Sequence, residues 1–299
     1  MKGFERHAVT GPFRAAAAAA LLALVTSVGC DRQSSDTTPD EASTDTPDGQ
    51  VASEEASQAA QQHMLEGTGH LQSGDNEQAV AAFTRAIEAA PGDARPYLRR
   101  AEARQKAGRQ EEALADLTQS IRLDAKNPVA YEIRGVIYGS TRRLPQAVAD
   151  FTQALRLDPQ SGKALINRGF AHEGLGRYDQ ALADYTEALR LKPGDPEVLN
   201  HRGALYVNLS RPNEAIADLD ESIRLQPRFA KAYVNRGAAY EKLNRPDRAV
   251  ADYTQAIELV PTLAVAYYNR GQVYERQGNR ERARADLAKV RELSAGGRR

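Results

Sequence analysis

The chain has 299 residues, of which 41% are hydrophobic, so it can hold two ordinary domains or one elongated array with a buried core. Its formal net charge is zero and no basic stripe is present, which argues against nucleic acid as a partner. The single cysteine, Cys30, excludes an internal disulfide and any metal site built from several cysteines.

Residues 1–29 have the pattern of a secretory signal peptide. A basic start precedes an apolar run over residues 15–25, which is shorter than the ~20 residues that span a bilayer. Residues 27–30 read Ser-Val-Gly-Cys and resemble the lipobox of bacterial lipoproteins, although Ser27 stands where leucine is usual. The resemblance implies that Cys30 carries acyl chains of the palmitate type and becomes the mature N-terminus. The alternative is a plain signal peptide followed by an ordinary thiol.

The lipidated cysteine and an acidic linker are predicted for residues 30–59. Residues 31–59 contain eight acidic residues against one arginine, no aromatic residue and one branched aliphatic residue, Val51. Such a segment cannot bury enough apolar surface to offset its ordering entropy, so we expect a disordered linker. A flexible chain of this length averages ~30 Å from end to end, which gives the following residues reach from a membrane.

From residue 60 the sequence repeats with a constant period. Position 8 of the repeat holds glycine or alanine, position 24 a large apolar residue, position 27 a small residue, and position 32 proline in five units. Position 20 is alanine throughout: Ala79, Ala113, Ala147, Ala181, Ala215, Ala249 and Ala283. The units are 60–93, 94–127, 128–161, 162–195, 196–229, 230–263 and 264–297.

These columns resemble the tetratricopeptide repeat (TPR). The resemblance covers residues 60–297 and implies an all-α fold, a right-handed superhelical solenoid of seven helix-turn-helix units. Positions 20, 24 and 27 share one face of the second helix, which is therefore amphipathic. We expect the small residue at position 8 to face the alanine at position 20, so that the two helices approach closely. A single hairpin cannot bury its apolar face, so neighbouring units stack.

Arginine at position 7 and aspartate at position 23 occur together in six units and are both absent from the first, which has Glu66 and Ala82. Joint presence and absence predicts an ion pair within each hairpin, which we favour over a ladder of anion sites. At half exposure such a pair contributes ~0–1 kcal/mol. The predicted pairs are Arg100 with Asp116, Arg134 with Asp150, Arg168 with Asp184, Arg202 with Asp218, Arg236 with Asp252, and Arg270 with Asp286.

The seventh unit differs from the others at positions that are aliphatic in units one to six. Positions 21 and 28 become Arg284 and Arg291. Since solenoids need polar terminal faces, this change predicts that no eighth unit packs there.

In the family, positions 2, 5, 6, 9, 12 and 13 of the first helix line a concave groove. The candidate peptide-binding residues on this surface are Lys163, Asn167, Asn200, His201, Lys231, Asn235, Tyr268 and Asn269. Amide side chains can donate to and accept from the main chain of an extended peptide, and we expect Asn167, Asn235 and Asn269 to face solvent. The alternative is that they are ordinary solvated surface. The set that grips a chaperone's C-terminal carboxylate is not assembled anywhere.

The sequence offers little for catalysis, so the chain is predicted not to be an enzyme. His63 and His70 are about 10 Å apart along one helix, too far to share a metal, and His172 occupies a core position. No catalytic residue, metal site, cofactor or small-molecule substrate is predicted. The predicted function is a TPR scaffold that binds a protein segment in the bacterial cell envelope, lipid-anchored with its repeats on the periplasmic side. The alternative is a self-associating structural protein of the envelope.

Overall fold

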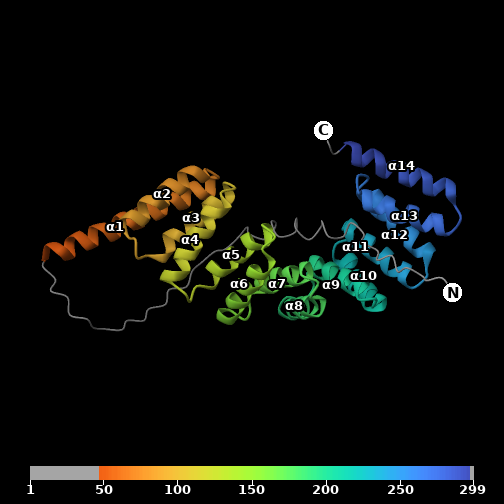
Figure 1. The fold of residues 1–299 in the computed structure, drawn as a ribbon, viewed down its shortest axis with the longest axis horizontal. Coiled ribbons are helices and arrows are strands. Elements are labelled where there is room, and N and C mark those ends of the chain that lie inside the picture. The colour runs from red at the N-terminus through yellow and green to blue at the C-terminus, as the bar shows by residue number, and fades with distance from the viewer. Residues whose placement is uncertain (1–46, 297–299) are drawn as a thin grey trace, which may run out of the picture. The chain divides into compact units, whose positions relative to one another are not determined.

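The computed structural model describes residues 47–296 and, within them, the side chains of 54–295. These residues form fourteen helices and no strand, which confirms the predicted all-α fold of seven hairpins (Figure 1). Cys30, the apolar run and the start of the acidic linker lie outside the described residues.

The chain divides into two units, each of which we describe by itself. The first unit ends at Leu175 and contains α1 (Pro47–Ser73), α2 (Asn76–Ala89), α3 (Ala94–Lys106), α4 (Gln110–Leu123), α5 (Pro128–Ser140), α6 (Leu144–Leu157) and α7 (Gly162–Gly174). The second unit begins at Gly176 and contains α8 (Tyr178–Leu191), α9 (Pro196–Asn208), α10 (Pro212–Leu225), α11 (Ala230–Lys242), α12 (Pro246–Leu259), α13 (Ala264–Arg276) and α14 (Arg280–Gly296).

Helix α1 begins before the first repeat, at Pro47, so residues 47–59 of the expected linker are helical. Proline suits the first helical position because its missing N–H has no intrahelical acceptor there. Glu54 and Glu55 lie in the N-terminal half of the helix and are exposed. Low apolar content therefore did not prevent a helix that continues directly into the packed part of α1.

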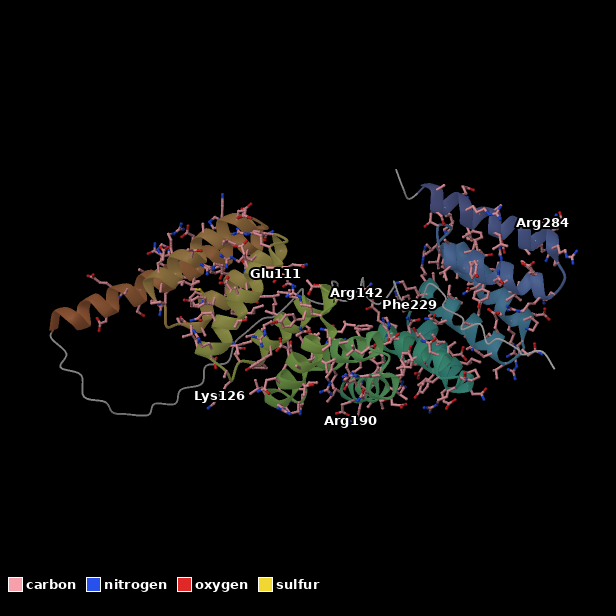
Figure 2. All side chains as sticks on the ribbon, viewed as in Figure 1. Glu111, Lys126, Arg142, Arg190, Phe229 and Arg284 are labelled. Carbon is pink, nitrogen blue, oxygen red and sulfur yellow. The ribbon has the colours of Figure 1, made fainter. Side chains whose placement is uncertain are left out.

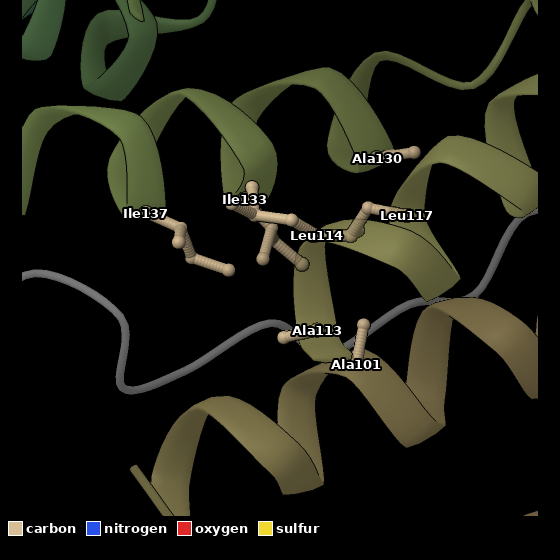
Figure 3. Close-up of a cluster of buried hydrophobic side chains, with 7 residues drawn as sticks. All are labelled: Ala101, Ala113, Leu114, Leu117, Ala130, Ile133 and Ile137. Atoms are coloured by element: carbon tan, nitrogen blue, oxygen red, sulfur yellow. The ribbon is translucent and has the colours of Figure 1, made fainter. Parts of the chain in front are cut away.

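The core is divided into local clusters, and each cluster joins one hairpin to the first helix of the next. Figure 3 shows one, in which Ala101 of α3, Leu117 of α4 and Ile133 of α5 are buried together. The clusters around Phe83, Leu219 and Tyr253 repeat this arrangement. Neighbouring hairpins within each cluster bury each other's apolar faces, as the repeat pattern requires.

Each hairpin turns at a residue with a left-handed backbone at position 15 of the repeat. Four of these residues are glycine: Gly74, Gly108, Gly176 and Gly278. The other three are Arg142 with φ of 63°, Ser210 with φ of 57° and Asn244 with φ of 54° (Arg142 is labelled in Figure 2). The left-handed region costs a residue with a Cβ atom roughly 1–2 kcal/mol, so the hairpin geometry overrides local preference at Arg142 and Ser210.

Position 8 is small because the ring or branched side chain at position 24 lies directly against its backbone. A Cβ atom added at Gly67 would lie 2.6 Å from Phe83, one at Gly237 2.7 Å from Tyr253, and one at Gly203 2.7 Å from Leu219. The atoms nearest to such a Cβ thus belong to position 24 at these glycines, whereas at Gly271 an atom of the position-20 residue Ala283 is among the nearest, at 3.5 Å. The alanines at position 20 are buried, and the side chain at position 24 fills the space that a Cβ atom at position 8 would need.

The arginine at position 7 pairs with the aspartate at position 23 in five of the six predicted cases. Arg100 donates two hydrogen bonds to Asp116, from Nε at 3.0 Å and from Nη2 at 2.7 Å. The same two-bond geometry joins Arg134 to Asp150, Arg202 to Asp218, Arg236 to Asp252, and Arg270 to Asp286. Arg168 belongs to the first unit and Asp184 to the second, so the sixth pair stays a prediction.

These pairs are more buried than the sequence led us to expect. The side chain of Asp116 is 5% exposed and that of Arg100 14%, because the pair lies between the two helices rather than at their outer edge. The carboxylates of Asp150, Asp218, Asp252 and Asp286 are buried as well. Removing one partner would therefore leave a largely desolvated charge. Its loss should lower the free energy of unfolding by more than the loss of a surface ion pair does.

The same arginine also contacts the preceding repeat. Arg100 Nη1 donates to the hydroxyl of Thr84 at 3.0 Å, and Arg270 Nη1 donates to Thr254 at 2.9 Å. In one repeat an acid replaces the threonine, and Arg236 donates to Asp220 at 2.6 Å. The threonine column at position 25 is the sequence signal for this contact.

In the first repeat, position 7 pairs with position 26 of the second helix instead of position 23. Glu66, at position 7, accepts a hydrogen bond at 2.7 Å from Arg85 of α2. The cation and the anion have thus exchanged helices, and Glu66 and Arg85 are 42% and 44% exposed.

We predict opposite effects for two glycines of α1. Gly67→Ala should destabilise the protein by ~1–3 kcal/mol, because Phe83 must move to admit the methyl group. Gly69→Ala should stabilise it by about 1 kcal/mol, because nothing lies within 4 Å and alanine is the better helix former. Denaturant unfolding of the two variants measures both effects, and an equal response would contradict the close approach.

We predict that Asp218→Ala costs about 3 kcal/mol, since Arg202 is then left largely buried without its carboxylate. Glu221→Ala is the matched control, because its ion pair with Arg224 is exposed to solvent and its loss should change the stability much less. A double-mutant cycle of Arg202 with Asp218 should show coupling above that of Arg224 with Glu221. Equal coupling in the two cycles would show that the buried pair adds nothing.

Candidate protein-binding surface

The first helices of successive hairpins lie side by side within each unit. In the second unit α9 contacts α11, and α11 contacts α13. In the first unit α1, α3, α5 and α7 contact one another in the same succession. Side chains at equivalent positions of these helices therefore form continuous rows, which is what a scaffold needs to hold an extended segment.

Five candidate residues in the second unit form what we call the second-unit surface. They are His201 of α9, Lys231 and Asn235 of α11, and Tyr268 and Asn269 of α13. Lys231 is exposed and Tyr268 is 42% exposed, whereas the other three are half-buried. The surface thus offers one cation, one large aromatic side chain and polar groups held by packing.

Asn200 is 3% exposed, so it supports this surface rather than facing solvent. The side-chain amide of Asn235 donates a hydrogen bond to its carbonyl oxygen at 2.8 Å. This bond joins α9 to α11 and fixes the orientation of the Asn235 side chain. One of the two N–H groups of Asn235 is therefore already used within the protein.

Packing around the His201 ring keeps the imidazole neutral at physiological pH. Burial lowers the pKa of His201 to about 4, and the positive charge of Lys231 acts in the same direction. The ring lies 6.2 Å from that of Tyr185, centroid to centroid. His201 therefore offers a partner an uncharged aromatic ring rather than a cation.

Glu241 of α11 joins two further groups near this surface. It accepts hydrogen bonds from the Tyr253 hydroxyl and from Arg276. Burial raises the pKa of Tyr253, against the effect of a hydrogen bond with Asn269, so the phenol stays protonated. No column of the repeat pattern predicts this contact, because Glu241 and Arg276 occupy positions 12 and 13 of different repeats.

The two candidates in the first unit, Lys163 and Asn167, lie on α7. Lys163 is half-buried, and Asn167 is 6% exposed. The expectation that Asn167 faces solvent is therefore wrong, because neighbouring side chains cover this position. Nearby, the Ser161 hydroxyl donates to Glu132, and burial raises the pKa of Glu132 while Lys163 opposes that shift.

Within the described residues, no three His, Cys, Asp or Glu side chains are grouped so that they could hold a metal ion. Among the helices that the structure describes, none combines the length and apolar character needed to cross a bilayer.

The geometry defines a helical-repeat scaffold, with stacked hairpins and a row of first helices. Models of the tetratricopeptide repeat match residues 64–128, 134–196, 196–229, 230–263 and 252–285. The chain therefore belongs to the tetratricopeptide repeat family, and it is a protein-binding repeat scaffold. Members of this family are generally non-enzymatic interaction scaffolds.

Three solved structures show the same kind of fold. YrrB, described as a TPR protein with an unusual peptide-binding site, is 27% identical, with a TM-score of 0.57 over 62% of this chain and 95% of its own. A tetratricopeptide repeat protein from Parabacteroides merdae is 21% identical, with a TM-score of 0.64 over 79% of this chain and 93% of its own. Pseudomonas aeruginosa pilF is 20% identical, with a TM-score of 0.61 over 71% and 96%. No curated protein matches the chain.

Proposed function

We propose that the chain is a lipid-anchored adaptor of the bacterial cell envelope that holds a segment of a partner protein on its second-unit surface. The observation that carries the proposal is the combination of exposed Lys231 and Tyr268 with half-buried polar groups on adjacent first helices. A large aromatic side chain beside fixed polar groups is the composition in which binding hot spots concentrate. The likeness to YrrB, which is described as a TPR protein with an unusual peptide-binding site, supports the same function.

The membrane tether is supported by the sequence alone. The apolar run over 15–25 ends close to the one cysteine of the chain, and the acidic residues of 31–59 follow. Acyl chains on Cys30 would hold the protein at a membrane, and the repeats would lie on the periplasmic side.

The rival function is self-association, in which the same exposed side chains contact a second copy of this chain. Tyr268 is large and exposed enough to serve either function. The two functions differ in the partner, so an experiment that identifies the contacting molecule separates them.

We predict that a photoreactive amino acid at position 268 crosslinks in intact cells to a protein other than this one. The matched control places the same amino acid at Glu258, which is exposed on α12, the second helix of its hairpin. This variant should not crosslink to that protein. With the partner identified, Lys231→Ala combined with Tyr268→Ala should weaken its binding by roughly tenfold or more, since each hot-spot side chain contributes over ~1 kcal/mol.

Folding should survive this double substitution because both side chains are exposed. Asn167→Ala would be a poorer test, since that buried amide would be lost from the interior. Crosslinks between two copies would establish the rival function, and crosslinks from position 258 alone would place the partner on another face.

We predict that Cys30→Ala moves the protein from the membrane fraction to the soluble fraction, because the acyl chains are its attachment. The mass of the mature N-terminus measures the modification directly. An unmodified N-terminus, or membrane association that Cys30→Ala leaves unchanged, would contradict the tether.

A further inference from the structure

A tyrosine at position 4 of the repeat lies over the position-7 arginine in four of the hairpins. The guanidinium carbon is 5.9 Å from the ring centroid for Arg100 with Tyr97 and 5.4 Å for Arg236 with Tyr233. The remaining two pairs, Arg134 with Tyr131 and Arg270 with Tyr267, are 5.7 and 5.8 Å apart. These distances are within the range of cation–π attraction.

Two of these tyrosines also bind the preceding repeat through the hydroxyl. Tyr97 donates to the carbonyl oxygen of Pro91 at 3.3 Å, and Tyr233 donates to that of Pro227 at 3.2 Å. Position 4 thus has a defined place for a phenol, with a guanidinium beside the ring and a proline carbonyl at the hydroxyl.

In the fourth repeat this tyrosine is replaced by a smaller residue, Leu165. An open hollow of about 290 Å³ lies there between α6 and α7. Its lining is Thr152, Leu155, Arg156, Pro159, Leu165 and Arg168. Pro159 and Arg168 occupy the same repeat positions as Pro91 and Arg100, so both groups that hold Tyr97 are present without the phenol.

The chemistry of the lining favours a phenol over an aliphatic side chain. The apolar lining residues are Leu155 and Leu165, of which Leu165 is 4% exposed, and the cationic lining residues are Arg156 and Arg168. A cation attracts the face of an aromatic ring, and no such attraction acts on an aliphatic group. Pro159 occupies the repeat position at which the carbonyl oxygens of Pro91 and Pro227 accept a tyrosine hydroxyl hydrogen.

We propose that this hollow binds a tyrosine side chain of a partner protein, with the ring beside Arg168 and the hydroxyl donating to Pro159. The partner's side chain would take the place that Tyr97 and Tyr233 fill from within the chain. The site belongs to the first unit and is separate from the second-unit surface. The hollow can therefore fail to bind tyrosine while the proposed function holds. Equally, the proposed function can fail while the hollow binds tyrosine.

The test uses methyl-labelled full-length protein and N-acetyl-tyrosinamide as the probe. Ring-current shifts of the Leu155 and Leu165 methyl signals should saturate with this probe in NMR titrations. N-acetyl-leucinamide should bind at least tenfold more weakly, and N-acetyl-phenylalaninamide, which lacks the hydroxyl, should fall between them. Equal binding of all three probes, or no saturable shift with the tyrosine probe, would overturn the proposal.

Leu165→Tyr closes the site from within, because it introduces the residue that four of the other repeats have at this position. It should abolish the Leu155 shifts while the thermal midpoint is kept or raised. Leu165→Phe is the second blocking variant and should act alike. Leu199→Tyr makes the same change at position 4 of the fifth repeat and should leave binding intact. Probe binding that persists in both blocking variants would also overturn the proposal.

Discussion

The close approach of the two helices in each hairpin is the constraint on which the rest of the structure depends. At Gly67, Gly203 and Gly237 the side chain from position 24 occupies the space of a Cβ atom. This contact sets the distance between the helices. The next residue toward the N-terminus, at position 7, then reaches across to the aspartate at position 23. The apolar contact joins positions 8 and 24, and the ion pair joins positions 7 and 23, so the two are adjacent in sequence. Both require the same short distance between the two helices.

The arginine at position 7 also explains how one hairpin is oriented against the preceding one. Its guanidinium has enough donors to bind the aspartate of its own hairpin and a hydroxyl of the preceding second helix. Because the pair is desolvated, a misplaced hairpin would leave charges unsatisfied. The local apolar clusters give the stack its stability, and the arginine gives each junction a defined orientation.

Repeat positions that are constant serve the fold, and those that vary are free to carry residues for binding. The residues at positions 8, 20 and 23 are nearly constant because the hairpin requires them. Lys231, Tyr268 and Leu165 lie at positions that vary, and none is needed to close a hairpin. The exposed side chains of the second-unit surface and the hollow at Leu165 are thus features that the fold permits but does not require.

The sequence by itself determined the number of repeats, the all-α fold and the partners in five of the six predicted Arg–Asp pairs, because each depends on spacing that a repeated pattern displays many times. Only the tertiary structure decided how deeply a residue lies. Asn167 and Asn200 share a polar character with Lys231, yet the first two are buried, because neighbouring helices cover them. The hollow at Leu165 was equally invisible, since a smaller residue leaves space only where its neighbours do not move to fill it. Burial and empty volume depend on the simultaneous positions of several helices, and no single column of the repeat carries that information.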